Sequence, residues 1–119
     1  MPTKPTISFP DFDKLDMRIG RIEAAEAVPE SKKLVKMHVD FGPKADGSDE
    51  RLKRQICAGI IKTYPPESLV GRQCLFLVNL EPRMLAGVES QGMLLATDAN
   101  DAPVLLIPDK ETAPGASVH

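Results

Sequence analysis

The chain has 119 residues, a length that suits one domain with its own hydrophobic core and requires no metal or disulfide to support it. Hydrophobic residues make up 42% and charged residues 27%, which is the composition of an ordinary globular protein and excludes a disordered or membrane-spanning chain. The net charge is -2, so binding to nucleic acid would require a local basic surface rather than a uniformly basic domain.

The N-terminal residues 1–8 are expected to form a flexible leader, and residues 9–119 a single domain. The leader lacks the apolar core of a signal peptide, and no apolar run is long enough to span a membrane, so we expect a cytoplasmic location without membrane association. Residues 9–15 predict a short helical turn that buries Phe12 and Leu15, with Asp11 as a possible N-cap.

The first strand is expected to begin at Met17. Its apolar positions change phase between Ile19 and Ile22, which predicts a β-bulge at Gly20–Arg21 where a strand bends around a small barrel. Residues 25–34 form a connection, and residues 35–41 alternate regularly between apolar and polar side chains. That alternation is typical of a strand with one buried face.

The remaining pattern completes a barrel. Turn-forming residues 42–50 predict a hairpin into a strand at 52–58, followed by a short helix at 59–64 and apolar strands at 74–78 and 93–96. Three strands, a short helix and two further strands are the order of an OB-fold. The sequence therefore predicts an all-β, five-stranded OB-fold barrel with a short helix between strands 3 and 4 and with N- and C-terminal extensions.

A polar loop at 79–92 lies between the last two predicted strands. Its amide, guanidinium and hydroxyl groups are suited to phosphate and sugar oxygens, and the candidates are Asn79, Arg83, Ser90 and Gln91. The alternative is a polar hairpin that only caps its own backbone.

Several ordered segments carry a family resemblance. They are Asp11-Phe12-x-Lys14-Leu15-Asp16-Met17-Arg18-Ile19-Gly20, Ser31-x-Lys33-Leu34, Val39-Asp40-Phe41-Gly42, Ala58-Gly59-Ile60 with Tyr64, Asn79-x-x-Pro82-Arg83, and Gly87-x-x-Ser90-x-Gly92-Met93-Leu94-Leu95-Ala96. Together they resemble the tRNA-binding domain found at the C-terminus of many methionyl-tRNA synthetases, in free-standing structure-specific tRNA-binding proteins and in CsaA-type secretion chaperones.

The resemblance implies a non-catalytic module that recognises the shape and backbone of tRNA, either free-standing or as the C-terminal part of a methionyl-tRNA synthetase, with an aminoacyl-tRNA synthetase as a further partner. The alternative is a CsaA-type export chaperone that binds unfolded preproteins. The residues at the family's RNA-binding positions are Lys33, Asn79, Arg83, Ser90 and Met93. Charge clustering alone adds Lys32, Lys36, Lys53 and Arg54. Met93 also fits a core position at the start of an apolar strand.

The run Val104-Leu105-Leu106-Ile107 is apolar at every position, so both faces of this strand require cover. The resemblance implies a homodimer through this C-terminal strand region, and cover by residues 1–12 is the alternative. No nucleophile motif, cofactor loop or metal-ligand cluster is recognisable, so we expect neither catalysis nor a cofactor nor a metal. Cys57 and Cys74 are expected to be buried free thiols.

Overall fold

The computed structural model describes residues 2–119 and is predominantly β. Two helices of one turn each accompany nine strands among these residues. The elements are α1 (Phe9–Phe12), β1 (Met17–Ala27), β2 (Val35–Pro43), β3 (Arg51–Ala58), α2 (Pro66–Leu69), β4 (Gln73–Leu77), β5 (Arg83–Leu85), β6 (Val88–Ser90), β7 (Met93–Leu94), β8 (Ala96–Ala99) and β9 (Ala102–Leu105). No helix in residues 2–119 is long and apolar enough to cross a membrane.

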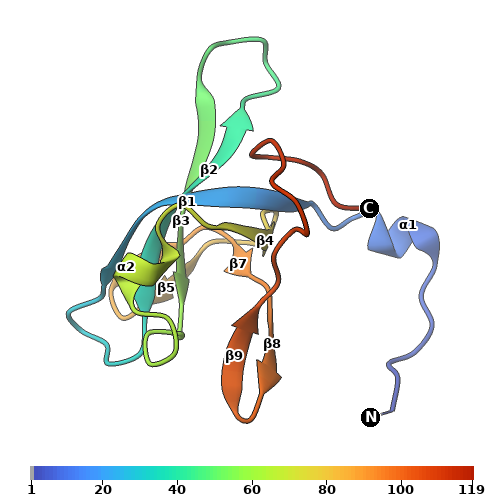
Figure 1. Cartoon of the computed structure of the whole chain (residues 1–119). Coiled ribbons are helices and arrows are strands. Elements are labelled where there is room, and N and C mark those ends of the chain that lie inside the picture. Colours follow the sequence, from blue (N-terminus) through green and yellow to red (C-terminus); the bar gives the residue numbers. More distant parts are fainter. Residues whose placement is uncertain (1) are drawn as a thin grey trace.

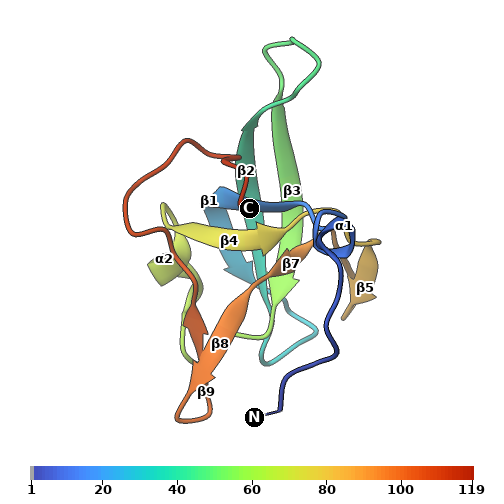
Figure 2. The ribbon, with the colours of Figure 1, turned by 90° about the vertical axis from the view of Figure 1, so that its right-hand side faces the viewer.

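The main sheet has five antiparallel strands in the order β3-β2-β1-β4-β7, and it curls into a half-barrel (Figure 1). Strand β1 links the two sides, because its first part pairs with β4 and its second part pairs with β2. Figure 2 shows β4 and β7 crossing in front of the longer β2–β3 hairpin. The predicted all-β, five-stranded OB-type fold is confirmed.

The core lies on the concave face of this sheet. The alternation predicted for residues 35–41 is confirmed, since Val35, Met37, Val39 and Phe41 are all buried. Phe41 meets Phe76 of β4 edge to face, with ring centroids 5.4 Å apart. This aromatic pair therefore packs β2 against β4 across the concave face and stabilises the curled shape of the sheet.

The β-bulge in β1 lies later than predicted. The register shifts between Ile22 and Ala24, not at Gly20–Arg21. A Cβ atom on Gly20 would approach Val39 Cγ1 to 2.5 Å, so Gly20 and Ile22 share the core-facing phase. The apparent phase change arose because Ile19 is also buried although it is out of phase with Gly20 and Ile22, and its backbone N–H and carbonyl hydrogen-bond with Ala116 and Gly115 of the C-terminal tail.

The predicted helix at residues 59–64 is wrong, because this segment forms turns and the helix begins at Pro66. Proline suits the first position of a helix, since the missing N–H would have no partner there. The predicted turn at the N-terminus exists as α1, but none of its residues is buried and Leu15 is 45% exposed. Asp11 does not cap it, because Ser8 occupies the N-cap position without a side-chain hydrogen bond.

The C-terminal apolar run is only partly buried. Leu105 lies in the core, whereas Val104, Leu106 and Ile107 are 37%, 38% and 62% exposed. The alternative cover by the N-terminus is wrong for the described residues 2–12, which run apart from the β8–β9 hairpin (Figure 1) and leave Phe9 71% exposed. The structure therefore leaves apolar side chains open in β9 and in the segment directly after it.

Candidate nucleic-acid interface

Two loops form one continuous surface beside strands β2 and β3. The loop after β4 folds into the β5–β6 hairpin, and its Leu85 and Val88 pack against Val28 and Leu34 of the β1–β2 loop. Buried Cys57 of β3 lies beneath both loops. A small apolar cluster therefore fixes the two loops relative to each other.

Ser90 holds the β5–β6 hairpin to the edge of β3. It is 4% exposed, and its hydroxyl accepts a hydrogen bond from the backbone N–H of Cys57 at 3.0 Å and donates one to the carbonyl of Gly92 at 3.2 Å. Gln91 continues the contact, because its backbone N–H donates to the carbonyl of Gln55 and its side-chain oxygen accepts from the Gln55 N–H. Side chains thus link β3 to this loop where no regular ladder exists.

Asn79 is also engaged within the protein. Its Oδ1 accepts the backbone N–H of Asp16 at 2.8 Å, and its Nδ2 donates to the carbonyl of Lys14 at 2.7 Å. Asn79 therefore anchors the start of the loop to the segment between α1 and β1. Asn79 bonds to residues outside the loop, as Ser90 does to Cys57, so neither side chain only caps the backbone of its own hairpin.

Arg83 and Met93 lie on the surface of the same loop. Both line a hollow with Leu80, Glu81 and Leu85, and Ser90 and Cys57 form its base. Met93 is 42% exposed, so it is not a core residue. The hollow therefore joins the Arg83 guanidinium to apolar side chains beside the Glu81 carboxylate, and the guanidinium and apolar groups suit a phosphate next to a ribose or base.

The β1–β2 loop presents Lys32 and Lys33. The hydroxyl of Ser31 accepts the backbone N–H groups of Lys33 and Leu34 at 3.3 and 3.2 Å, which turns Leu34 inward and leaves both lysines exposed. Within residues 2–119, no carboxylate lies within 4.0 Å of Lys32 or Lys33. The two lysines are available to an external anion.

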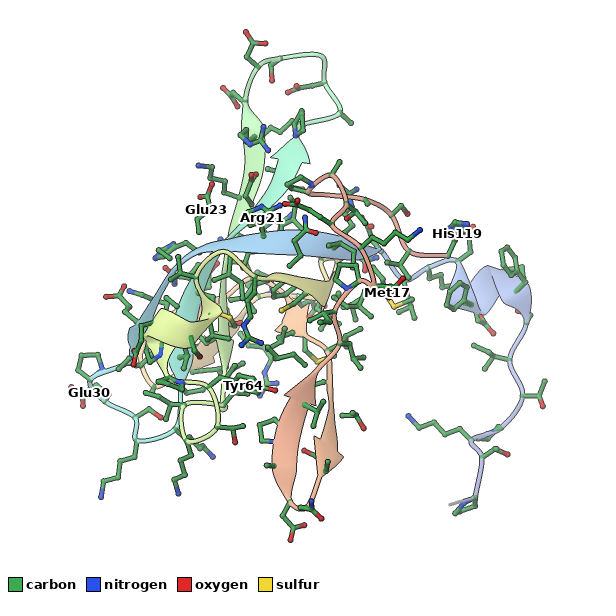
Figure 3. All side chains as sticks on the ribbon, in the orientation of Figure 1. Met17, Arg21, Glu23, Glu30, Tyr64 and His119 are labelled. Atoms are coloured by element: carbon green, nitrogen blue, oxygen red, sulfur yellow. The ribbon has the colours of Figure 1, made fainter. Side chains whose placement is uncertain are left out.

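The cations on β2 and β3 are less available. Lys36 pairs with Glu26 at 2.9 Å and Lys53 pairs with Glu23 at 3.2 Å. The hydrogen bond from Lys36 holds the pKa of Glu26 below its usual value. Arg54 is half-buried opposite Val39, on the core-facing phase of β3. Figure 3 labels Glu23 beside Arg21, well away from the loop that carries Glu30.

One group of acidic side chains lies away from the two loops. Asp46, Asp49 and Glu50 lie at the far end of the β2–β3 hairpin, which projects at the top of Figure 1 away from β5. Lys44 pairs with Glu50 at 2.9 Å in the same hairpin. The fold therefore keeps this acidic group away from Lys32, Lys33 and Arg83, although Glu30, Glu81 and Glu89 lie within the two loops.

The cysteines do not contribute reactive chemistry to this surface. Both are free and buried, and burial raises the pKa of Cys57 and raises that of Cys74 to about 11. In the part of the chain that the structure describes, no three His, Cys, Asp or Glu side chains gather in a group that could hold a metal ion.

Sequence reasoning missed Lys62, which lines a separate pocket with Lys33. Lys62 stands alone in the sequence, so charge clustering gave no signal for it. Only the fold brings the two lysines to one place, because the backbone N–H of Ile61 donates to the carbonyl of Lys33.

Comparison with known proteins supplies independent information. Residues 17–117 match the model of the family described as "Putative tRNA binding domain". The methionine–tRNA ligase of Methanococcoides burtonii is 50% identical over 117 residues, which cover 98% of this chain and 16% of that protein. The chain thus spans about a sixth of the length of the curated relatives it matches.

Two solved structures have the same fold along nearly the whole chain. A MetRS-related protein from Pyrococcus horikoshii superposes with a TM-score of 0.83 at 37% identity, covering 98% of this chain and all of that one. The chaperone CsaA from Bacillus anthracis superposes with a TM-score of 0.80 at 32% identity, covering 97% of this chain and all of that one.

Proposed function

Because the chain belongs to the "Putative tRNA binding domain" family, we propose that it binds tRNA without catalysing a reaction and does so in the cytoplasm. The observation that carries this proposal is the packing of the β1–β2 loop against the β5–β6 hairpin. Lys32 and Lys33 belong to the first of these segments and Arg83 to the second, so the packing supports one basic surface built from both. OB-folds bind oligonucleotides on the corresponding face, between the loop that joins strands 1 and 2 and the loop that joins the last two strands.

The residues divide into contacting and positioning groups. Lys32, Lys33 and Arg83 neutralise phosphates, and Met93 makes an apolar contact with a ribose or base. Asn79 and Ser90 act through the loop, since their polar atoms are bonded to the backbone of neighbouring segments.

The cations on strands β2 and β3 contribute less to RNA binding than the loop cations do. Lys36 and Lys53 reach RNA only by exchanging a carboxylate for a phosphate, so each contributes less than an unpaired lysine. Arg54 is half-buried and contributes at the edge of the surface.

A homodimer would bring two such surfaces to one tRNA. The open apolar face at Val104, Leu106 and Ile107 supports an interface in the C-terminal strand region. Similarity to methionine–tRNA ligases supports a role at the C-terminus of such an enzyme or as a separate protein that assists a synthetase.

The decisive experiment is fluorescence anisotropy of labelled total tRNA titrated with the protein at several salt concentrations. Engagement of Lys32, Lys33 and Arg83 predicts a slope of log affinity against log salt of about -2 to -3. Affinity that does not change with salt, or no binding to tRNA at all, would contradict the proposal.

Binding of unfolded preproteins is the second candidate. It is supported by the similarity to a CsaA chaperone and by the exposed apolar side chains of Leu80 and Met93 in the hollow. Competition separates the two functions. Under the tRNA proposal, unlabelled tRNA displaces the labelled tRNA and an excess of an unfolded precursor peptide does not.

A further inference from the structure

A second pocket lies where three loops meet at one end of the barrel. Its lining residues are Lys33, Gly59, Ile60, Lys62, Thr63, Asp101 and Pro103. These residues come from the β1–β2 loop, the turns after β3 and the β8–β9 hairpin. None except Lys33 was a candidate from the sequence, and none lines the hollow that contains Arg83.

The cationic wall of this pocket is held by the backbone. The N–H of Ile61 donates to the carbonyl of Lys33 at 3.1 Å, which fixes the two loops side by side. The stem of Lys33 lies across Gly59, with its Cδ 3.8 Å from the position that a Cβ would take there. Within residues 2–119, neither Lys33 nor Lys62 has a carboxylate within 4.0 Å. Two unpaired ammonium groups therefore flank one pocket.

The opposite wall carries a carboxylate. Asp101 occupies the tight turn of the β8–β9 hairpin, where Asn100 and Asp101 have φ angles of 51° and 62°. The hairpin is tied to the turns after β3, because the Tyr64 hydroxyl accepts the N–H of Leu105 at 3.4 Å. Figure 3 shows Tyr64 between the turns after β3 and the β8–β9 hairpin. No Lys or Arg among residues 2–119 pairs with Asp101.

We propose that this pocket binds one ribose–phosphate unit of RNA, with the phosphate on Lys33 and Lys62 and the 2′-hydroxyl donating to the carboxylate of Asp101. The proposal rests on the proposed function and extends its surface around the end of the barrel. An ammonium pair complements the phosphate charge, whereas an ionised carboxylate only accepts hydrogen bonds.

This arrangement discriminates between RNA and DNA. Deoxyribose has no 2′-hydroxyl, so a DNA strand would leave Asp101 without a donor and close to a phosphate of like charge. The 2′-hydroxyl is the group that distinguishes RNA from DNA at a given site. Asp101 therefore acts as a specificity residue and the lysines supply affinity.

The phosphate contact is tested by Lys62→Ala in the full chain, with Lys110→Ala as the matched control because Lys110 is an exposed lysine outside both pockets. Lys62→Ala is expected to weaken tRNA binding several-fold and to reduce the salt slope by about 1. Lys62→Arg should restore both values. Unchanged affinity and slope in Lys62→Ala, while the unmodified chain binds tRNA, would overturn this pocket and leave the proposed function intact.

The ribose contact is tested by Asp101→Gly, because glycine adopts positive φ without strain and removes the acceptor. Asn100→Gly changes the neighbouring position of the same turn and serves as the control. The probes are an RNA stem-loop and its all-2′-deoxy analogue. Asp101→Gly is expected to lower the ratio of RNA to DNA affinity several-fold, whereas Asn100→Gly leaves it unchanged. Equal gains for RNA and DNA in Asp101→Gly would mean that Asp101 only repels phosphate and would overturn the ribose assignment.

Discussion

The Ser90 hydroxyl accepts the backbone N–H of Cys57 at 3.0 Å, and this contact closes the edge of the half-barrel beside the proposed RNA surface. A side-chain oxygen here takes the place of the carbonyl that a neighbouring strand would supply. Since Ser90 is buried, its contribution to RNA binding is expected to pass through the position of the hairpin that carries Arg83.

Ser90→Ala should therefore lower the unfolding free energy of the domain, although it removes no group from the exposed surface. Removing the hydroxyl leaves the buried N–H of Cys57 without its acceptor, which costs about 1–3 kcal/mol. Urea denaturation measures this loss as a lower midpoint. Ser117→Ala removes an exposed hydroxyl from the C-terminal tail and should change the midpoint little. Equal midpoints for the two variants would contradict a positioning role for Ser90.

Arg83→Ala is expected to weaken tRNA binding with little change in the stability of the fold. Arg83 is exposed and, in the described chain, pairs with no carboxylate, so its loss should change the unfolding free energy by less than about 0.5 kcal/mol. Loss of one charge-assisted phosphate contact should weaken tRNA binding about tenfold, with a similar effect on different RNA sequences. Anisotropy titrations measure the affinity, and unchanged affinity in the folded variant would remove Arg83 from the site.

The strands were predictable where burial leaves a simple sequence pattern, whether one face of the strand is buried or both. Alternation at residues 35–41 identified β2, and continuous apolar residues identified β4. The helix was misplaced because Gly59–Tyr64 has local helical character, yet a long-range bond from Ile61 to Lys33 holds it in turns. The bulge was misplaced because Ile19 is buried out of phase with Gly20 and Ile22, in a part of β1 whose backbone bonds to the C-terminal tail, which is distant in sequence.

The polar loop was predictable as a connection between two strands, but the contacts of its side chains were not. Motif positions identified the loop, whereas only coordinates show that Asn79 and Ser90 satisfy backbone groups and that Arg83 does not. Pairing of Lys36 with Glu26 likewise depends on strand register, which charge clustering does not report. Charge clustering did not indicate Lys62, because the other lysine of its pocket, Lys33, is 29 positions earlier in the chain.

A pH-dependent contribution to stability is expected from Asp40 and Arg51. Burial opposes ionisation of Asp40, but hydrogen bonds from Arg51 and from the Gly42 N–H outweigh it and hold the pKa of Asp40 below its usual value. A carboxyl group with a lowered folded-state pKa stabilises the fold fully above the unfolded-state value of about 4. The contribution is lost as pH falls through the lower folded-state pKa.

Asp40→Asn tests this contribution. At pH 7 the variant should lose about 1–3 kcal/mol of unfolding free energy, because Arg51 and the Gly42 N–H lose a charged acceptor. The difference from the unmodified protein should shrink as the pH is lowered below 4. Thermal denaturation across this pH range measures it. Asp49→Asn, in the exposed part of the same hairpin, should show no such difference, and a difference that grows on acidification would contradict the role assigned to Asp40.

The proposed homodimer depends on which residues of the C-terminal run face outward. Leu105 is 7% exposed and belongs to the core, whereas Ile107 is 62% exposed beside Leu106. Ile107→Asp would place a charge in a twofold interface and should give monomers that remain folded, while Leu105→Asp should unfold the domain because its charge enters the core. Multi-angle light scattering measures the mass, and circular dichroism distinguishes a folded monomer from an unfolded chain.

Folded Ile107→Asp monomers should also bind tRNA more weakly with Arg83 intact, because two linked surfaces bind one RNA more tightly than a single surface. A monomeric mass for the unmodified protein at micromolar concentration would contradict the dimer.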